Sequence, residues 1–194
     1  MIKEGAQLIL LLGPMKSGKS GALFSYFGPL GVSVVPWMAY MPARNTRDET
    51  IWSRVGKGGI KFDRSKVQKV DSLECALETS DKVVGIDEIH MFHPDQADII
   101  RMILSQGKDV IAAGLDMDYR GVVYEIITRL MALGPDEVNK FQAVCDVCGQ
   151  WNAHFTQILH DGIPVLEGLP SIIPDDKTHE YKYQARCREH FVRK

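Results

Sequence analysis

With 194 residues, of which 45% are hydrophobic, the chain has enough apolar material for one sizeable core and a small appendage beside it. Its formal net charge is −2 and its isoelectric point is about 6.3, so the composition does not supply the basic surface that general binding to nucleic acid or to anionic membranes requires. No apolar run approaches the roughly 20 residues of a membrane span. We therefore expect small soluble partners, no nucleic acid and no membrane.

The first apolar run, residues 6–12 (AQLILLL), follows Glu4 and leads directly into a glycine-containing loop. A secretory signal would instead combine a basic start, an apolar stretch and a cleavage site of small residues. We interpret the run as the first strand of a cytoplasmic protein.

Further apolar runs follow at residues 32–36, 82–87 and 109–116, and such runs are typical of strands buried on both faces of a parallel sheet. Helical patterns separate them. Asp71, with Glu74 three residues later, resembles a capping box; residues 95–108 are amphipathic; and a third helix covers about residues 123–133. This alternation predicts an α/β fold with a mainly parallel sheet flanked by helices.

The pattern changes near residue 140. The later part contains a C-x-x-C, the alternating stretch WNAHFTQIL at residues 151–159, a turn at HDG (160–162) and a segment rich in Pro and Asp. We expect residues 1–140 to form the main α/β domain and residues 141–194 a small β appendage that is held together by a metal.

Residues 13–20 fit G-x-x-x-x-G-K-[ST], the loop whose backbone amides cradle phosphates between a strand and a helix. An ordinary glycine turn is the alternative, but the aliphatic strand in front of it favours the phosphate site. Lys19 would reach the β- and γ-phosphates of ATP, and the Ser20 hydroxyl would ligate Mg²⁺. The loop makes the expected fold one of the P-loop (RecA-like) type, with ATP-binding residues Gly13, Pro14, Met15, Lys16, Ser17, Gly18, Lys19 and Ser20.

Two consecutive carboxylates, Asp87 and Glu88, end the apolar run KVVGID. A P-loop fold presents a carboxylate to the metal at this edge of its sheet. We expect Asp87 to hold Mg²⁺ and Glu88 to act as the base on the group that attacks the γ-phosphate. A solvated acidic pair is the alternative reading.

Three of the four cysteines gather with a histidine in the pattern C-x-x-C…C-x-x-H, at Cys145, Cys148, Cys187 and His190. Four such ligands suit tetrahedral Zn²⁺, and a site without an open position is structural. Two unrelated thiol pairs are the alternative. His154, His160 and His179 are the alternatives to His190 as the fourth ligand.

The motifs GPMKSGKS, IDEIHMF, GLDMDYRG, VCDVCG, FTQIL and YQARCREHF, in this order, resemble the zinc-containing, P-loop thymidine kinase family. The resemblance implies transfer of the γ-phosphate of ATP to the 5′-hydroxyl of thymidine, with Glu88 as general base. It also implies a homotetramer, feedback inhibition by thymidine triphosphate, and a lasso loop at about residues 168–183 that closes over the base.

The same resemblance assigns further site residues. Arg47, His90 and Arg120 would join the ATP-binding set, and residues around the thymidine would be Met15, Met91, Leu115, Tyr119, Tyr124, Thr156 and Tyr183. A surface position for Arg120 and ordinary core packing for the apolar and aromatic residues are the alternatives. Asn45, His90, Met91 and Lys16 depart from the family pattern, and the acceptor could be deoxyuridine or an analogue.

Two other functions stay open. The departures in the site would fit a nucleotide-binding regulatory subunit with impaired transfer. A nucleic-acid-coupled ATPase would need a basic stripe with aromatic residues, and the segment CDVCGQWNAHF contains neither Lys nor Arg.

Overall fold

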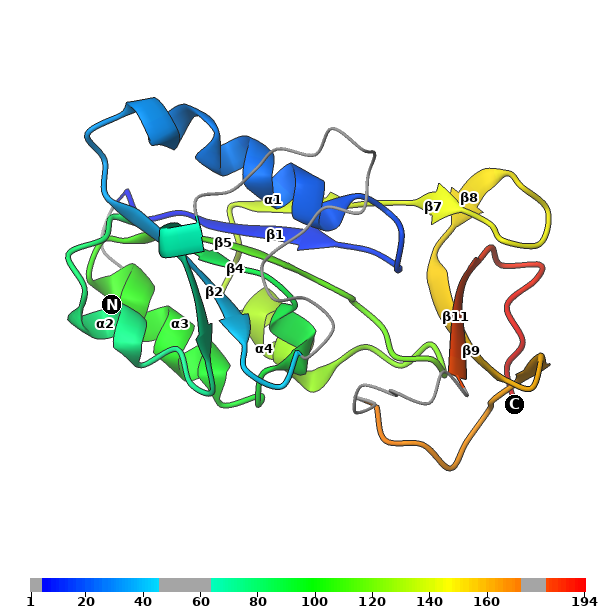
Figure 1. Ribbon diagram of the computed structural model, residues 1–194. Helices are drawn as coiled ribbons and strands as arrows, with labels where there is room; N and C mark the ends of the chain where they lie inside the picture. Colours follow the sequence, from blue (N-terminus) through cyan, green and yellow to red (C-terminus); the bar gives the residue numbers. More distant parts are fainter. Residues whose placement is uncertain (1–4, 46–63, 172–180) are drawn as a thin grey trace.

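Six parallel strands form the central sheet of the computed structural model, which describes residues 5–45, 64–171 and 181–194 (Figure 1). The spatial order is β3-β2-β4-β5-β1-β6, and every neighbouring pair is parallel. The strands are β1 (Leu8–Leu12), β2 (Trp37–Pro42), β3 (Val67–Val70), β4 (Val83–Ile86), β5 (Asp109–Gly114) and β6 (Glu137–Lys140). The predicted α/β fold with a mainly parallel sheet is confirmed.

Helices cover both faces of this sheet (Figure 1), with α1 (Lys19–Phe27) on one face and α2 (Cys75–Glu78), α3 (Gln96–Ser105) and α4 (Glu125–Ala132) on the other. Short 3₁₀ turns lie at Pro29–Val32, Arg64–Lys66 and Ile89–Met91. Successive residues of β1 serve the two faces in turn: Leu10 packs in the cluster that contains α3 and α4, whereas Leu11 packs in the cluster that contains α1. All five residues of β1 are buried, as a strand between two helical layers requires.

The prediction of a strand at residues 32–36 is wrong. A 3₁₀ turn that ends at Val32 leads into an exposed segment, in which Val34 is fully exposed. The strand is β2, where Ala39, Tyr40 and Met41 have no exposed surface. The prediction relied on the intrinsic preference of valine for strands. In the structure, pairing with β3 and β4 decides which residues enter the sheet.

The helix expected from Asp71 is also shorter than predicted. The Leu73 N–H donates to the side chain of Gln96 at 2.7 Å, and the Glu74 N–H donates to the Ser72 hydroxyl at 3.3 Å. These contacts hold the segment in a turn, and α2 begins only at Cys75. The sequence also missed β3 and β6, since these edge strands are largely exposed and lack an apolar run.

Beyond β6 the chain forms two small antiparallel sheets. One pairs β7 (Ala143–Val144) with β8 (Trp151–Ala153), and the other has the order β10-β9-β11, made of β10 (Ile163–Pro164), β9 (Phe155–His160) and β11 (Tyr181–Arg186). The predicted turn at HDG joins β9 to β10, where Asp161 and Gly162 have φ values of 50° and 81°. A two-residue turn with positive φ at both positions matches the twist of the strands that it joins.

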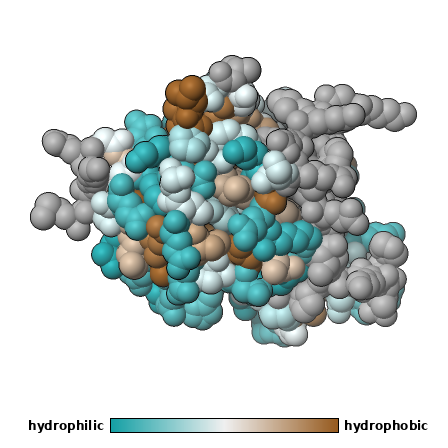
Figure 2. Space-filling view, turned by 60° about the vertical axis from the view of Figure 1, so that its left-hand side comes forward, coloured by the Kyte–Doolittle hydropathy of each residue, from teal (hydrophilic) through white to brown (hydrophobic). Residues whose placement is uncertain are grey.

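On the face shown in Figure 2, hydrophilic residues predominate and hydrophobic residues form small separate patches. None of the helices in the described part of the chain has the length and apolar character needed to cross a membrane.

A glycine in β4 fixes how closely α1 approaches the sheet. A Cβ at Gly85 would lie 2.5 Å from Cζ of Phe27, whose side chain is buried. We predict that Gly85→Ala lowers the free energy of unfolding by about 1–3 kcal/mol, because the ring must move within a packed core.

Urea unfolding measures this loss. Gly31→Ala is the matched control, since a Cβ there meets no atom within 4 Å. An unchanged urea midpoint for Gly85→Ala would show that the interface between α1 and β4 is looser than described.

Candidate active site and metal centre

The predicted phosphate loop joins the end of β1 to the start of α1. Gly18 precedes the helix with φ 84°, a left-handed conformation that glycine adopts without steric cost. The Lys19 ammonium lies across the loop, where it donates to the Pro14 carbonyl at 2.7 Å and to the Ser17 hydroxyl at 3.3 Å. The loop therefore surrounds the ammonium group of Lys19.

Carboxylates surround this cation. Burial lowers the pKa of Lys19, and the negative charges of Glu88, Asp87 and Asp116 oppose that effect. The strands β4 and β5 supply these acids at the sheet edge where β1 ends. Asp116 is nearly buried and is paired with Lys140, the last residue of β6. The sequence reasoning missed this ion pair, because the two residues are 24 positions apart and Lys140 belongs to none of the motifs.

Asp87 follows β4 and is buried. Its Oδ1 atom accepts the Glu88 N–H at 3.0 Å and lies 3.4 Å from the Ser20 hydroxyl. Burial, reinforced by the charge of Glu88, raises the pKa of Asp87 to about 7. A hydroxyl and a carboxylate side by side are hard oxygen donors of the kind that Mg²⁺ prefers, so the two predicted magnesium ligands fit that ion.

Glu88 has an unusual backbone conformation, with φ 51° and ψ 41°. Few residues other than glycine adopt this left-handed region, and such strain is concentrated at functional sites. Its Oε2 atom lies 3.4 Å from Nδ1 of His90, and its side chain is about one-third exposed (31%). The two consecutive carboxylates thus face different partners: Asp87 faces the phosphate loop, and Glu88 faces His90.

His90 connects the ends of two strands. Its Nδ1 atom accepts the N–H of Leu115, just after β5, at 3.2 Å. Its ring centroid lies 5.0 Å from that of Tyr124. A Cβ at Gly114 would lie 2.8 Å from Cγ2 of Ile89 and 3.2 Å from both the backbone nitrogen and Nδ1 of His90. Glycine therefore allows the close approach of His90 to the end of β5.

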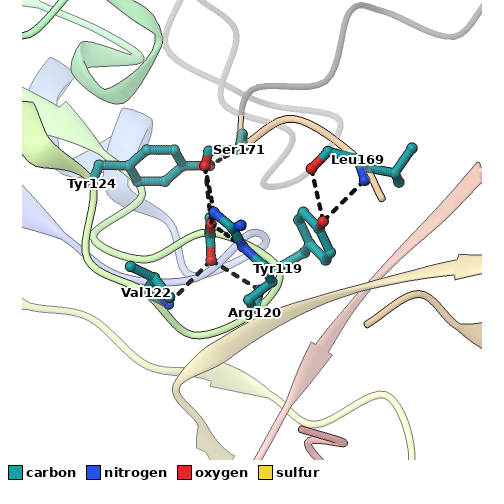
Figure 3. Close-up of polar contacts among 7 residues, drawn as sticks. Tyr119, Arg120, Val122, Tyr124, Leu169 and Ser171 are labelled. Atoms are coloured by element: carbon teal, nitrogen blue, oxygen red, sulfur yellow. Dashed lines mark hydrogen bonds and ion pairs between the residues drawn. The ribbon is translucent and has the colours of Figure 1, made fainter. Parts of the chain in front are cut away.

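Two tyrosines after β5 hold residues 169–171, the described start of the predicted lasso loop (Figure 3). The Tyr119 hydroxyl donates to the Leu169 carbonyl at 2.8 Å and accepts the Leu169 N–H at 3.2 Å. The Tyr124 hydroxyl donates to the Ser171 carbonyl at 2.9 Å, and burial raises the pKa of Tyr124, which keeps this donor protonated. Residues 172–180 lie outside the described part of the chain.

Asp118 organises the same region and was missed by the sequence reasoning. Its buried carboxylate accepts the backbone N–H groups of Arg120 and Val122 at 2.9 and 3.1 Å. It also accepts the guanidinium of Arg120 at 2.5 and 2.8 Å and the Ser171 hydroxyl at 3.1 Å (Figure 3). The guanidinium of Arg120, which we expected near phosphate, is thus engaged by Asp118 and Ser171.

The remaining predicted residues divide between the two sides of the site. The Met15 N–H, in the phosphate loop, donates to the hydroxyl of buried Thr156 on β9 at 3.0 Å. Met91 and Leu115 are half-buried after β4 and β5, and Tyr183 is half-buried on β11. Arg47 lies outside the described residues.

The predicted zinc ligands converge. The ligand atoms of Cys145, Cys148, Cys187 and His190 all lie within 4.8 Å of one another, and this is the one such cluster among the residues that the structure describes. Nδ1 of His190 lies 3.1 Å from Sγ of Cys187 and 4.0 Å from Sγ of Cys145. A tetrahedral ion with Zn–S bonds of about 2.3 Å spaces its ligand atoms roughly 3.5–4 Å apart, so small shifts of these side chains would complete a Zn²⁺ site.

The electrostatics of the cluster favour a thiolate. Burial raises the pKa of Cys145, but backbone N–H groups that point at its sulfur outweigh this effect and lower the pKa to about 6. The two other described candidates, His154 and His160, are not part of the cluster, and His179 lies outside the described residues.

Comparison with known proteins agrees with this geometry. The family model described as thymidine kinase matches residues 6–191, nearly the whole chain. The chain belongs to the thymidine kinase family. Thymidine kinases of Coprothermobacter proteolyticus and Pyrobaculum aerophilum are 34% and 33% identical to it, over 98% and 95% of this chain and 92% and 98% of their own lengths. A thymidine kinase of a Roseiflexus species is 29% identical over 95% of this chain and 94% of its own length. The family resemblance that the sequence motifs indicated is confirmed.

We predict that the protein, purified without chelators, carries about one Zn²⁺ per chain and that Cys187→Ser carries far less. Loss of one of four ligands opens the tetrahedral shell. Since metal binding supplies on the order of 10 kcal/mol of folding free energy to such small modules, the variant also unfolds at a lower temperature.

Elemental analysis and thermal unfolding measure the two effects. Cys75→Ser is the matched control, because Cys75 lies outside the cluster. Equal zinc content in Cys187→Ser and in the parent would remove Cys187 from the ligand set.

Proposed function

We propose that the chain is an ATP-dependent thymidine kinase that produces thymidine monophosphate and ADP. The membership of the family supports this proposal. The single structural observation that carries it is the meeting of Lys19, Ser20, Asp87 and Glu88 at one edge of the sheet. A phosphate-binding loop, a pair of oxygen donors for a metal and a second carboxylate are the parts that phosphoryl transfer requires.

In this proposal ATP lies against residues 13–20, and Lys19 neutralises its β- and γ-phosphates. Ser20 and Asp87 hold Mg²⁺, which supplies charge stabilisation to the phosphates when it is bound. His90, Arg47 and Arg120 complete the nucleotide side. A phosphate contact from Arg120 would require its guanidinium to leave Asp118 and Ser171.

Glu88 is the proposed general base. Its carboxylate accepts the proton of the 5′-hydroxyl while the new O–P bond forms and the bond from the γ-phosphorus to the β-phosphate oxygen breaks. Partial exposure and a position one residue beyond Asp87 support this role, since the group must reach the acceptor without joining the metal ligands. A positioned base contributes a rate factor of about 10²–10⁴.

The thymidine site would lie between the loops after β4 and β5 and the strands β9 and β11. Its proposed residues are Met15, Met91, Leu115, Tyr119, Tyr124, Thr156 and Tyr183. The hydrogen bond from Met15 to Thr156 supports this placement, because it brings the phosphate loop against the sheet that carries Tyr183. The tyrosine contacts with residues 169–171 support a loop that covers the base and excludes water.

The zinc ion in this proposal is structural, since four protein ligands leave no open position. It would hold the appendage of residues 141–194 together beside the nucleotide-binding domain of residues 1–140. The homotetramer, the feedback inhibition by thymidine triphosphate and the cytoplasmic location remain predictions, and sedimentation tests the first of them.

We predict that Glu88→Gln lowers kcat by about 10²–10⁴ and leaves the affinities for ATP and thymidine nearly unchanged, because the amide keeps the shape and removes the basicity. Steady-state kinetics with a panel of nucleosides and ATP·Mg²⁺, together with direct nucleotide binding, make the measurement. Glu74→Gln is the control, since that side chain is exposed and is not one of the proposed site residues.

Several outcomes would contradict these assignments. A turnover within a few-fold of the parent would exclude Glu88 as the base, and loss of ATP binding would move it into the metal shell. A parent chain that binds nucleotide without transfer would be a regulatory subunit. ATP hydrolysis stimulated by single-stranded DNA would indicate the nucleic-acid-coupled ATPase.

A further inference from the structure

The side chain of Lys16, in the middle of the phosphate loop, forms an ion pair with the loop that contains the first two zinc ligands. Its Nζ atom lies 2.8 Å from both carboxylate oxygens of Asp146. Asp146 stands between Cys145 and Cys148, so the contact joins residues 130 positions apart. The sequence reasoning had placed Lys16 among the ATP-binding residues.

Asp146 is held firmly on the other side. Its Oδ2 atom accepts the Ala185 N–H at 2.6 Å, and its own N–H donates to the Ala185 carbonyl at 2.9 Å. Ala185 is buried on β11, two residues before the zinc ligand Cys187. The carboxylate that receives Lys16 is therefore fixed between both halves of the zinc cluster.

The backbone of Lys16 has an unfavourable conformation that the ion pair can stabilise. Lys16 has φ 64°, one of three positive values among the described residues other than glycine. This left-handed conformation is unfavourable for a lysine, and it lies among the backbone amides that would face phosphate. Because Lys16 and Asp146 are 52% and 27% exposed, the pair contributes little to overall stability, but it can select one conformation of a short loop.

Two other contacts from the appendage hold only the start of the phosphate loop. A Cβ at Gly13 would lie 2.6 Å from the Phe141 carbonyl oxygen, and the Met15 N–H donates to Thr156. The hydrogen bonds of Lys19 to Pro14 and Ser17 lie within the loop, so the ion pair of Lys16 is what ties the centre of the loop to the appendage.

We propose that Lys16 is a positioning residue: through Asp146, the zinc cluster holds the phosphate loop in the conformation that binds ATP. This inference rests on the proposed function. Lys16 acts through the loop backbone and not by contact with a phosphate.

The experiment compares Lys16→Met, Asp146→Asn and Lys16→Arg with the parent, in the full zinc-loaded chain. Lys16→Met and Asp146→Asn raise KM for ATP, and Kd for a fluorescent ATP analogue, by about two- to fivefold, the range of an exposed ion pair. The kcat and the KM for thymidine stay within twofold, and Lys16→Arg keeps the affinity of the parent. The matched control is Lys194→Met, which breaks an exposed lysine–carboxylate pair with Glu167 at the C-terminus.

Additivity and hydrogen exchange provide readouts that do not depend on turnover. The double variant Lys16→Met/Asp146→Asn binds the analogue no more weakly than the weaker single variant, because both changes remove the same contact. The amides of residues 15–18 exchange faster in Lys16→Met, while its zinc content equals that of the parent. Lys16→Met retains all four predicted zinc ligands. The comparison of Lys16→Met with the parent therefore stays decisive even if Asp146→Asn loses metal.

Other results overturn the inference. Weaker binding in Lys16→Met with unchanged or tighter binding in Asp146→Asn would mean that Lys16 contacts phosphate directly. Affinities equal to the parent in both variants, in a parent that phosphorylates thymidine, would reject the coupling and leave the proposed function intact. A parent that transfers no phosphate to thymidine, with variants that still weaken nucleotide binding, would reject the proposed function and support the coupling.

Discussion

Parallel pairing of β1 with β5, and of β5 with β4, is the constraint on which the rest of the structure depends. It brings the ends of three strands to one edge of the sheet, so that the phosphate loop, Asp87 and Asp116 meet there although they lie far apart in the sequence. The pairing is stable because β1 is buried on both faces. The chemistry of the site is therefore a consequence of how the core is packed.

Burial at this edge gives the site its electrostatic character. The Lys19 ammonium is nearly buried, and the carboxylates of Asp87, Glu88 and Asp116 offset the cost of removing its charge from water. Asp116 also pairs with a second cation, Lys140. Asp87 instead lies next to the negative charge of Glu88, which together with burial raises the pKa of Asp87. A concentration of buried charge that only partly neutralises itself is typical of sites that bind a charged ligand.

The appendage after β6 contacts this edge through several polar groups. Met15 donates to Thr156, Lys16 pairs with Asp146, and the tyrosines after β5 hold residues 169 and 171. The buried cluster around the predicted zinc site consists of three alanines and two of the predicted zinc ligands, and Phe155, Ile158, Leu159 and Phe191 are buried elsewhere in the appendage. The predicted Zn²⁺ would add stability to this small module, and the polar contacts hold the module against the phosphate loop.

The sequence alone determined the phosphate loop, the carboxylates that end β4, the four converging zinc ligands and the buried first strand. Each of these is a local pattern, in which the chemistry requires certain residue types at fixed spacing. The tertiary structure decided the position of β2, the edge strands β3 and β6, the role of Asp118 and the partner of Lys16. These features depend on which segments meet in space, and contacts such as the one between Lys16 and Asp146 join residues 130 positions apart, a distance over which no local pattern carries information.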